Sequence, residues 1–226
     1  MPGEIEMTRV LAVADEVAPV LYTERLTKIH PDLVLGCGDL PFDYLEYLVT
    51  VTNVPLLYVP GNHDADLDPR RQRVPAGELG KPFLSSYLED PPGPRGCVNV
   101  DLDIAEAAGL RVVGLGGSIR YSPGPNQYTQ AEMSRRARRL RWRVAKKKMR
   151  HGGGVNILLT HSPPRGLGDG NDPAHQGFRA LNNLIGALAP KLLVHGHVHP
   201  YGQVFNDRVV GGTTVVNAVP YRILEV

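Results

Sequence analysis

The sequence has little cysteine and no long hydrophobic run. Its 226 residues include two cysteines, Cys37 and Cys97, which excludes a disulfide framework and a four-cysteine zinc site. No stretch approaches the roughly eighteen apolar residues that a membrane-spanning helix needs, so no membrane partner is expected. The N-terminus carries Glu4 and Glu6 where a signal peptide would be basic, and we therefore predict a cytoplasmic protein.

Acidic residues are missing from residues 135–150, which hold ten lysines and arginines. Outside this segment the chain has 15 basic and 23 acidic residues, so the net charge of +2 hides a strong imbalance. A helix here would bury a modest apolar stripe of Met133, Ala137, Leu140 and Val144. Its basic face is interpreted as a solvated surface, a surface that steers anionic phosphate substrates, or a footprint for nucleic acid.

The composition is otherwise that of a globular protein. Hydrophobic residues make up 42% of the chain and charged residues 21%, which excludes wholesale disorder. We predict one domain over residues 1–226, with a surface excursion at about 66–96, where proline, glycine and arginine are frequent.

Short β-rich apolar runs alternate with helical patterns along most of the chain. The predicted strands are Val10–Ala14, Leu33–Leu35, Leu56–Val59, Val98–Leu102, Arg111–Leu115, Val155–Thr160, Lys191–Val194, Gly202–Val204 and Thr213–Ala218. The predicted helices are Pro19–Ile29, Phe42–Thr50, Thr129–Arg150 and Phe178–Leu188. This alternation predicts an α/β fold with a mixed sheet.

Several of the predicted strands end at residue types that commonly serve as metal ligands. These residues are Asp15, Asp39, Asn62-His63-Asp64, His161, and the histidines of Gly196-His197-Val198-His199. Ligands gather at the carboxyl ends of strands in α/β sheets, so these residues are expected to converge. Imidazole, carboxylate and amide groups together suit Mn, Fe or Zn, and we predict one or two divalent ions per chain.

The same residues, in this order, resemble the calcineurin-like metallophosphoesterase superfamily. The resemblance covers residues 15–199 and implies a four-layer α/β/β/α sandwich of two mixed sheets with a two-metal site. It implies that Asp39 bridges the ions, that Asn62, His161 and His197 complete one site, and that Asp15 and His199 belong to the other. It also implies that His63 is a catalytic acid and phosphate contact, with Asp64 beside it.

The activity implied by this resemblance is hydrolysis of a phosphate-ester small molecule, either a phosphodiester or a small phosphomonoester. Metal-activated hydroxide would attack, and two ions would clamp the attacking and leaving oxygens. Two alternatives remain at this point. One is a weakly catalytic or non-catalytic module that binds metal or phosphate, and the other is a nuclease that uses the basic helix at 135–150.

The first motif departs from the family pattern of Asp-x-His, because Val17 stands where the family has histidine. Three explanations are open: water fills the gap at a weakened site, the centre holds one ion, or another residue substitutes. The candidates for substitution are Glu16, Tyr22 and His175. Glu16 would point away from Asp15 if the strand continued through it.

The loop after His161 contains two further candidates for substrate binding. Arg165 is able to pair with a phosphate through two parallel hydrogen bonds. His175 is placed at the mouth of the metal site, where it would contact phosphate. The alternative is a polar surface loop that ends in a helix cap at Asp172.

Overall fold

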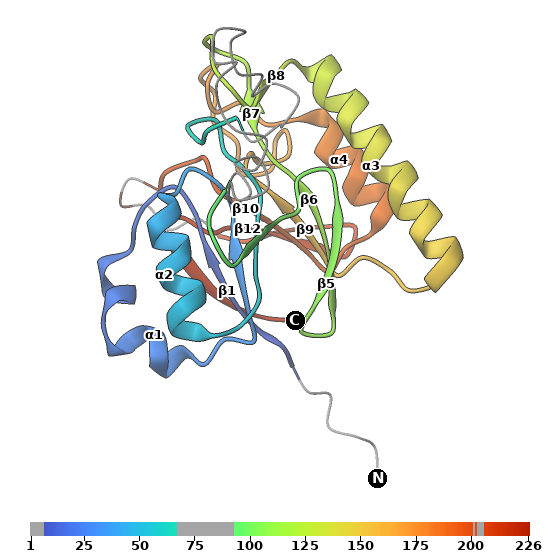
Figure 1. The fold of residues 1–226 in the computed structure, drawn as a ribbon. Helices are drawn as coiled ribbons and strands as arrows, with labels where there is room; N and C mark the ends of the chain where they lie inside the picture. Colours follow the sequence, from blue (N-terminus) through green and yellow to red (C-terminus); the bar gives the residue numbers. More distant parts are fainter. Residues whose placement is uncertain (1–6, 67–92, 201, 203–205) are drawn as a thin grey trace, which may run out of the picture.

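Two β-sheets form the centre of the molecule, with helices on their outer faces (Figure 1). The computed structural model describes residues 7–66, 93–200, 202 and 206–226. The excursion predicted at 66–96 and the strand predicted at Gly202–Val204 lie outside these residues, apart from their ends. None of the described helices is both long and apolar enough to cross a bilayer.

The first sheet has five strands in the order β13-β1-β2-β3-β4. Their bounds are β1 (Arg9–Val13), β2 (Leu33–Gly36), β3 (Leu56–Tyr58), β4 (Cys97–Asn99) and β13 (Tyr221–Glu225). The first four are parallel, and β13 pairs antiparallel with β1. The strand predicted at Val98–Leu102 corresponds to β4, which is shorter and begins one residue earlier.

The second sheet has six strands in the order β11-β12-β10-β9-β6-β5. Their bounds are β5 (Ile104–Ala107), β6 (Leu110–Leu115), β9 (Ile157–Thr160), β10 (Leu192–His195), β11 (Arg208–Val210) and β12 (Thr213–Asn217). The four inner strands are parallel, and the edge strands β5 and β11 are antiparallel to their neighbours. A separate pair is formed by β7 (Ser118–Ile119) and β8 (Gln127–Tyr128).

The helices are η1 (Pro19–Tyr22), α1 (Glu24–Ile29), α2 (Phe42–Thr52), α3 (Gln130–His151) and α4 (Arg179–Leu188). The helix predicted over 19–29 is broken at Thr23, because the hydroxyl of this residue caps α1 by accepting from the Arg25 amide. The long helix α3 begins with a capping box in which Thr129 and Glu132 bond each other's backbone amides.

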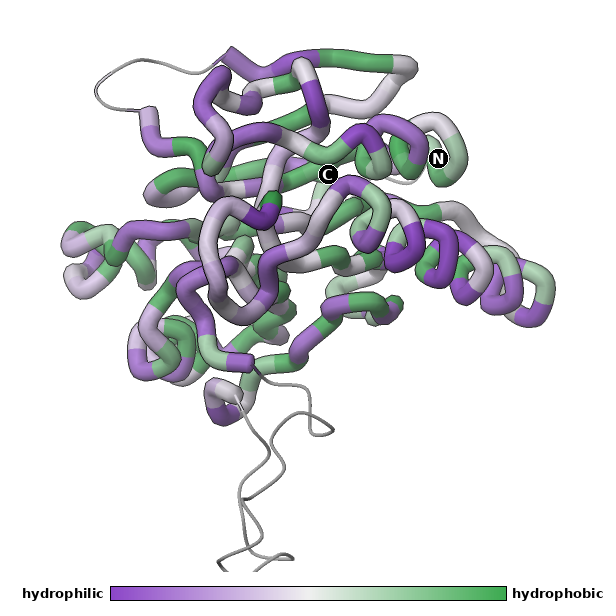
Figure 2. Tube along the Cα trace, turned by 90° about the horizontal axis from the view of Figure 1, so that it is seen from above, coloured by the Kyte–Doolittle hydropathy of each residue, from purple (hydrophilic) through white to green (hydrophobic). Residues whose placement is uncertain are grey.

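Three hydrophobic clusters fill the three interfaces between four layers. Val10 and Ala12 of β1 face the second sheet, whereas Leu11 and Val13 face α1 and α2. The second sheet packs its other face against α3 and α4. Hydrophobic segments run through the middle of the molecule, between more hydrophilic outer segments (Figure 2). Strands buried on both faces read as continuous apolar runs, and the predicted four-layer α/β/β/α fold of two mixed sheets is confirmed.

Candidate metal centre

Four side chains from both sheets meet at the carboxyl ends of the parallel strands. Asp15 follows β1, Asp39 follows β2, His161 follows β9 and His197 follows β10. Each offers one ligand atom, and these four atoms lie within 4.8 Å of one another. The sandwich therefore brings carboxylates of the first sheet and imidazoles of the second sheet to one point.

The backbone at three of these residues has an uncommon conformation. Asp15, Asp39 and His197 have φ angles of 59°, 56° and 68°, in the left-handed region that costs energy for residues other than glycine. Two glycines make room beside them. A Cβ on Gly61 would clash with the Asp39 carboxylate, and a Cβ on Gly196 would clash with the Asp15 carboxylate. The loops are thus shaped around the two carboxylates.

The inner half of the centre consists of Asp39, Asn62, His161 and His197. His161 is fully buried, and its Nδ1 lies 2.8 Å from the carbonyl oxygen of Cys37. If Nδ1 carries the proton, Nε2 is an acceptor, and it lies 3.0 Å from Asn62 Oδ1 and 3.3 Å from Asp39 Oδ2. Three acceptor atoms, His161 Nε2, Asn62 Oδ1 and Asp39 Oδ2, then face one another. This arrangement is stable when a proton or a metal cation lies between them.

Electrostatics at this point favour a cation. Burial alone would lower the pKa of His161, but Asp39 and Asp15 together with hydrogen bonds raise the pKa to about 9. Burial alone would likewise raise the pKa of Asp39, but the charge and hydrogen bond of His161 lower the pKa to about 2. The same negative charges of Asp39 and Asp15 that hold a proton on His161 would attract a metal ion.

His197 is oriented by its backbone and by a loop carbonyl. Its Nε2 donates to the Ala174 carbonyl at 2.8 Å, which leaves Nδ1 as the nitrogen with a free lone pair that could bind a metal ion. Burial, and then the charge of His161, lower the pKa of His197 to about 3, so its imidazole is neutral. The His197 amide donates to Asp15 Oδ2 at 2.8 Å. Burial raises the pKa of Asp15.

The outer half of the centre consists of Asp15, Glu16, Val17 and His199. The Nε2 atom of His199 lies 4.0 Å from Asp15 Oδ1, and its Nδ1 lies 2.6 Å from Glu16 Oε1. β1 ends before Asp15, and the Glu16 amide bonds back to the Ala14 carbonyl, so the extended strand that would turn Glu16 away is absent. Val17 is 36% exposed.

His63 and Asp64 are adjacent in sequence but lie in different surroundings. The His63 amide donates to Asp39 Oδ1 at 2.7 Å, and the residue is exposed. The Asp64 carboxylate accepts from the amides of Asp39 and Gly61 at 2.9 and 2.8 Å. Burial raises the pKa of Asp64. Asp64 therefore ties the loop after β2 to the loop after β3.

The remaining sequence candidates have partners of their own. His175 Nδ1 lies 2.9 Å from both carboxylate oxygens of Asp172, and the His175 ring lies 5.2 Å from the His197 ring. Arg165 donates to Asp169 at 3.1 Å. His175 is thus beside the cluster, whereas the Arg165 guanidinium is engaged in its own loop. Tyr22 packs its ring against Tyr44 and Tyr47.

Two further residues position the candidate ligand loops, and no motif in the sequence assigns them this role. The Tyr121 hydroxyl accepts from Asn62 Nδ2 at 3.1 Å, which turns Asn62 Oδ1 toward His161. The Asn126 amide donates to the carbonyls of Gly61 and Asp64 at 3.0 and 3.2 Å. Both residues are about sixty positions away from Asn62 in sequence, so a local pattern has no means of revealing them.

The donor set fits a divalent metal ion. Carboxylate oxygens, an amide oxygen and neutral imidazole nitrogens are ligands for Mn, Fe or Zn, and the partners described above fix their orientation. Tight glycine contacts keep the carboxylates in place. The residues therefore could hold the ions that the sequence predicts.

Comparison with known proteins places the chain among phosphoesterases. The sequence pattern of the family described as calcineurin-like phosphoesterase matches residues 11–201. One solved structure has a TM-score of 0.64 and 18% identity, covering 97% of this chain and 95% of that one. The structure of TT1561 of Thermus thermophilus has a TM-score of 0.55 and 19% identity, covering 94% and 89%. No curated protein matches the chain at a significant level.

Proposed function

The chain belongs to the calcineurin-like phosphoesterase family, and from this premise we propose that it hydrolyses phosphodiesters or small phosphomonoesters with divalent metal. The observation that supports this most directly is the cluster of Asp15, Asp39, His161 and His197 within 4.8 Å. A charge removed from water needs an ionic partner or a metal ion, so two carboxylates and two imidazoles gathered at this range suit a bound cation.

The inner half would hold the first ion through Asp39, Asn62, His161 and His197. A divalent ion bound there supplies an activated water and withdraws charge from the phosphate oxygens. The Cys37 carbonyl keeps the proton of neutral His161 on Nδ1, so that Nε2 faces the ion position. Manganese, iron or zinc suits this mixture of oxygen and nitrogen donors.

His63 is proposed as the catalytic residue nearest the substrate. Its backbone is bonded to the Asp39 carboxylate, while the residue is exposed to solvent. An imidazole at this position is able to donate a hydrogen bond to phosphate or a proton to the leaving oxygen. Asp64 is proposed as a positioning residue, since its carboxylate is engaged by the amides of Gly61 and Asp39.

Glu16 is proposed to compensate for the missing histidine at the position of Val17. Its carboxylate bonds His199 Nδ1 at 2.6 Å, so that His199 Nε2 is turned toward Asp15. A carboxylate behind a histidine ligand fixes the ring and makes the nitrogen more basic. The outer site then keeps Asp15 and His199 as ligands, with one nitrogen fewer than the family pattern, and binds its ion more weakly.

Chromogenic esters test the proposal. Bis(p-nitrophenyl) phosphate and p-nitrophenyl phosphate are offered to the protein with Mn²⁺, and a His63→Gln variant is compared with an Asp43→Asn control on α2. We expect His63→Gln to lower kcat by about 100-fold with unchanged metal content, and the control to be unaffected. Hydrolysis that does not respond to His63→Gln would refute the assigned role of His63.

A second candidate function is a metal-binding or phosphate-binding module with little or no catalysis. Val17 in place of histidine favours it, because a two-metal mechanism requires both sites to be filled. The same assay separates the candidates. Bound metal without turnover of either ester at millimolar Mn²⁺ would support the binding module and contradict the phosphoesterase proposal.

A further inference from the structure

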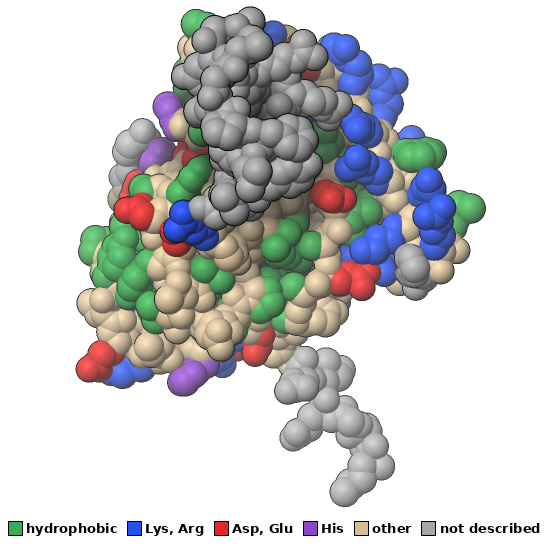
Figure 3. Space-filling model, viewed as in Figure 1, with side chains coloured by type: hydrophobic (Ala, Val, Ile, Leu, Met, Phe, Trp, Pro, Cys, Tyr) green, Lys and Arg blue, Asp and Glu red, His purple; other side chains and the backbone are tan. Residues whose placement is uncertain are grey.

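The outer side of α3 presents a row of cations around one exposed aromatic ring. Arg135, Arg139, Trp142, Lys146 and Arg150 recur at intervals of three or four residues, which places them on one face of the helix. We call this row the α3 basic face. It extends over about 22 Å at 1.5 Å per residue. Figure 3 shows Lys and Arg side chains gathered over this helix.

The cations of this row differ from their neighbours on the same helix. Arg136, Arg143 and Lys147 point toward the body of the protein and pair with Asp101, Asp103 and Glu106 at 2.7, 3.9 and 3.4 Å, respectively. The four cations of the α3 basic face make no ion pair within the part of the chain that the structure describes. The positive potential of the row is therefore directed outward, where it attracts anions.

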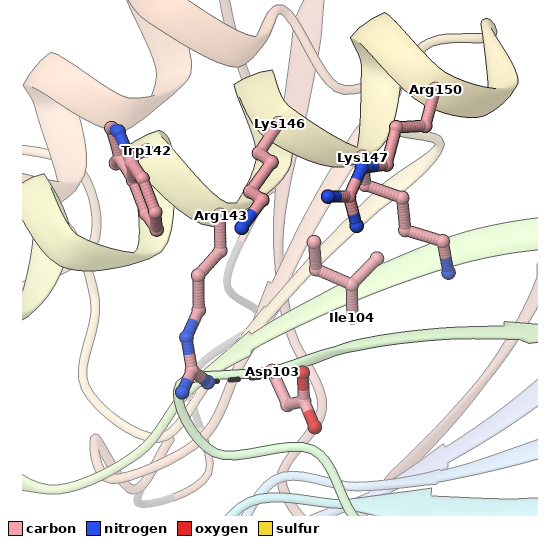
Figure 4. Close-up of a pocket in the computed structure, with 7 residues that line it drawn as sticks. All are labelled: Asp103, Ile104, Trp142, Arg143, Lys146, Lys147 and Arg150. Atoms are coloured by element: carbon pink, nitrogen blue, oxygen red, sulfur yellow. Dashed lines mark ion pairs between the residues drawn. The ribbon is translucent and has the colours of Figure 1, made fainter.

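A groove runs beside this row, between α3 and the start of β5. It has a volume of about 460 Å³. Trp142, Lys146 and Arg150 line it from the helix, above Ile104, together with Arg143, Lys147 and the carboxylate of Asp103 (Figure 4). Trp142 is 64% exposed, and Lys146 Nζ lies 5.2 Å from the centroid of its ring. An aromatic surface with cations on both sides is thus open to solvent.

Core packing does not account for Trp142. The apolar stripe of α3 is already buried against the second sheet through Met133, Ala137, Leu140 and Val144. A bilayer is also a poor fit, because an interfacial helix needs a continuous apolar face to insert. The outward side of α3 offers Trp142 and Met149 among charged residues.

We propose that the α3 basic face binds a single-stranded nucleic acid. Phosphates would pair with Arg135, Arg139, Lys146 and Arg150, and a base would stack on Trp142. A positive groove that follows the backbone, together with an aromatic platform for bases, is how proteins bind single strands without sequence preference. The surface acts by binding alone and does not depend on hydrolysis at the metal centre.

The N-terminal end of α3 lies on the side of the molecule that holds the candidate metal centre. The helix begins four residues after Asn126, whose amide bonds Gly61 beside the metal ligands. A strand that follows the α3 basic face toward the N-terminus of the helix is therefore led toward the metal centre. Binding at α3 and reaction at the centre are separate events, so either one is testable when the other fails.

Intrinsic fluorescence provides a direct measurement, because Trp142 is the only tryptophan of the chain. The full-length protein is titrated with a twenty-nucleotide oligothymidylate at several salt concentrations, with anisotropy of a labelled strand as a second signal. We expect stacking to quench the fluorescence and log K to fall with log salt by about 0.7 for each phosphate neutralised. Binding without quenching would refute stacking on Trp142.

Matched variants test whether this face of the helix is the one that binds. Arg139→Gln/Lys146→Gln removes two charges of the α3 basic face, and Arg138→Gln/Arg141→Gln removes two from the flank that faces α4. We expect the first pair to weaken binding at least tenfold at moderate salt and the second less than threefold. Equal losses would refute the groove and indicate binding by overall charge.

Trp142 is tested by two substitutions and two competing anions. Trp142→Ala should weaken binding of the labelled strand by roughly 5- to 150-fold, the range for loss of one stacked base, and Trp142→Phe should retain most of it. Heparin should bind without quenching the fluorescence. A blue shift of the fluorescence with phosphatidylserine vesicles, at concentrations where the oligonucleotide has no effect, would overturn the proposal in favour of a membrane surface.

Discussion

The two halves of the candidate metal centre differ in burial and in how their side chains are held. In the inner half, His161 is fully buried and Asn62 is 4% exposed, and both are fixed by hydrogen bonds to the protein. In the outer half, the side chains of His199 and Glu16 are 31% and 51% exposed and hold each other. Solvent screens the outer pair, so we expect the same residue types to bind a cation less firmly there.

This difference supports the proposal that a two-ion site in this chain tolerates Val17 in place of a histidine. The inner half depends on loops tied together by Asp64 and Asn126, through hydrogen bonds that do not involve Val17. The altered residue lies at the solvent-facing margin. We therefore expect substitutions in the inner half to abolish metal binding and those in the outer half to adjust it.

The largest effect is expected from Asp39→Asn, which alters the carboxylate closest to His161. The His161 Nε2 atom is 3.3 Å from Asp39 Oδ2, so both charge and ligand are lost. We expect kcat/KM to fall by about 10³-fold or more, equivalent to about 4 kcal/mol, with loss of bound metal. Metal analysis and ester hydrolysis measure this, with Asp43→Asn as the control. Retained metal in Asp39→Asn would contradict the inner site.

The next largest effect is a dependence of metal affinity on pH. In the metal-free protein the pKa of His161 is about 9, above its ordinary value of 6.5, because burial, which lowers the pKa, is outweighed by Asp39, Asp15 and the hydrogen bond to the Cys37 carbonyl together. The protonated pair stabilises the metal-free fold below about pH 6.5, and this contribution is lost as pH rises through 9. A metal must displace this proton, so affinity should rise about tenfold per pH unit between about pH 6 and 8.

Calorimetry measures directly the proton that His161 releases when the metal binds. Titration of metal in buffers of different ionisation enthalpy should give about one proton released per inner ion at about pH 7. The Asp39→Asn protein is not a suitable reference, because it loses the ligand as well. An affinity that is constant between about pH 6 and 8, with no dependence on buffer, would show that His161 is neutral in the metal-free protein.

A smaller effect is expected in the outer half from Glu16→Gln. Glutamine keeps the size of the side chain but removes the charge that faces His199 Nδ1 at 2.6 Å. We expect the affinity for the second ion to fall by about 10-fold, with the first ion unchanged. The control is Glu24→Gln on α1, which alters an exposed carboxylate paired with Lys28. An equal loss at both ions would show that the two halves are not independent.

The sequence predicted the interior of the fold better than its edges. Strands buried on both faces, such as β1 and β2, have continuous apolar runs and were predicted within one or two residues. The edge strands β5, β11 and β13 were missed. Each has one neighbouring strand and mixes exposed charged residues such as Glu106, Arg208 and Glu225 into its pattern, so no apolar run marks it.

The candidate site was predictable where it depends on strand ends. Asp39 and His161 each follow an apolar run closely, and parallel strands bring such positions to one edge. The pairing of Glu16 with His199 was not predictable, because it depends on the left-handed backbone at Asp15, which ends β1 early. Contacts made by Tyr121 depend on tertiary packing and leave no local pattern.

An effect of about the same size as that of Glu16→Gln, and of opposite sign, is expected from Val17→His, which restores the nitrogen that the family pattern has. Val17 is partly exposed, so a larger side chain fits without disturbing the core. If the outer site only lacks a ligand, the affinity for the second ion should rise by about tenfold, and calorimetry should approach two ions per chain. Val20→His on η1, at a similarly exposed position, is the control. If Glu16 already fills the position, Val17→His alone should have no effect and should restore the affinity that Glu16→Gln removes. The single Val17→His variant therefore decides whether Glu16 orients His199 or replaces the missing histidine itself, because the double variant returns to the original affinity in either case.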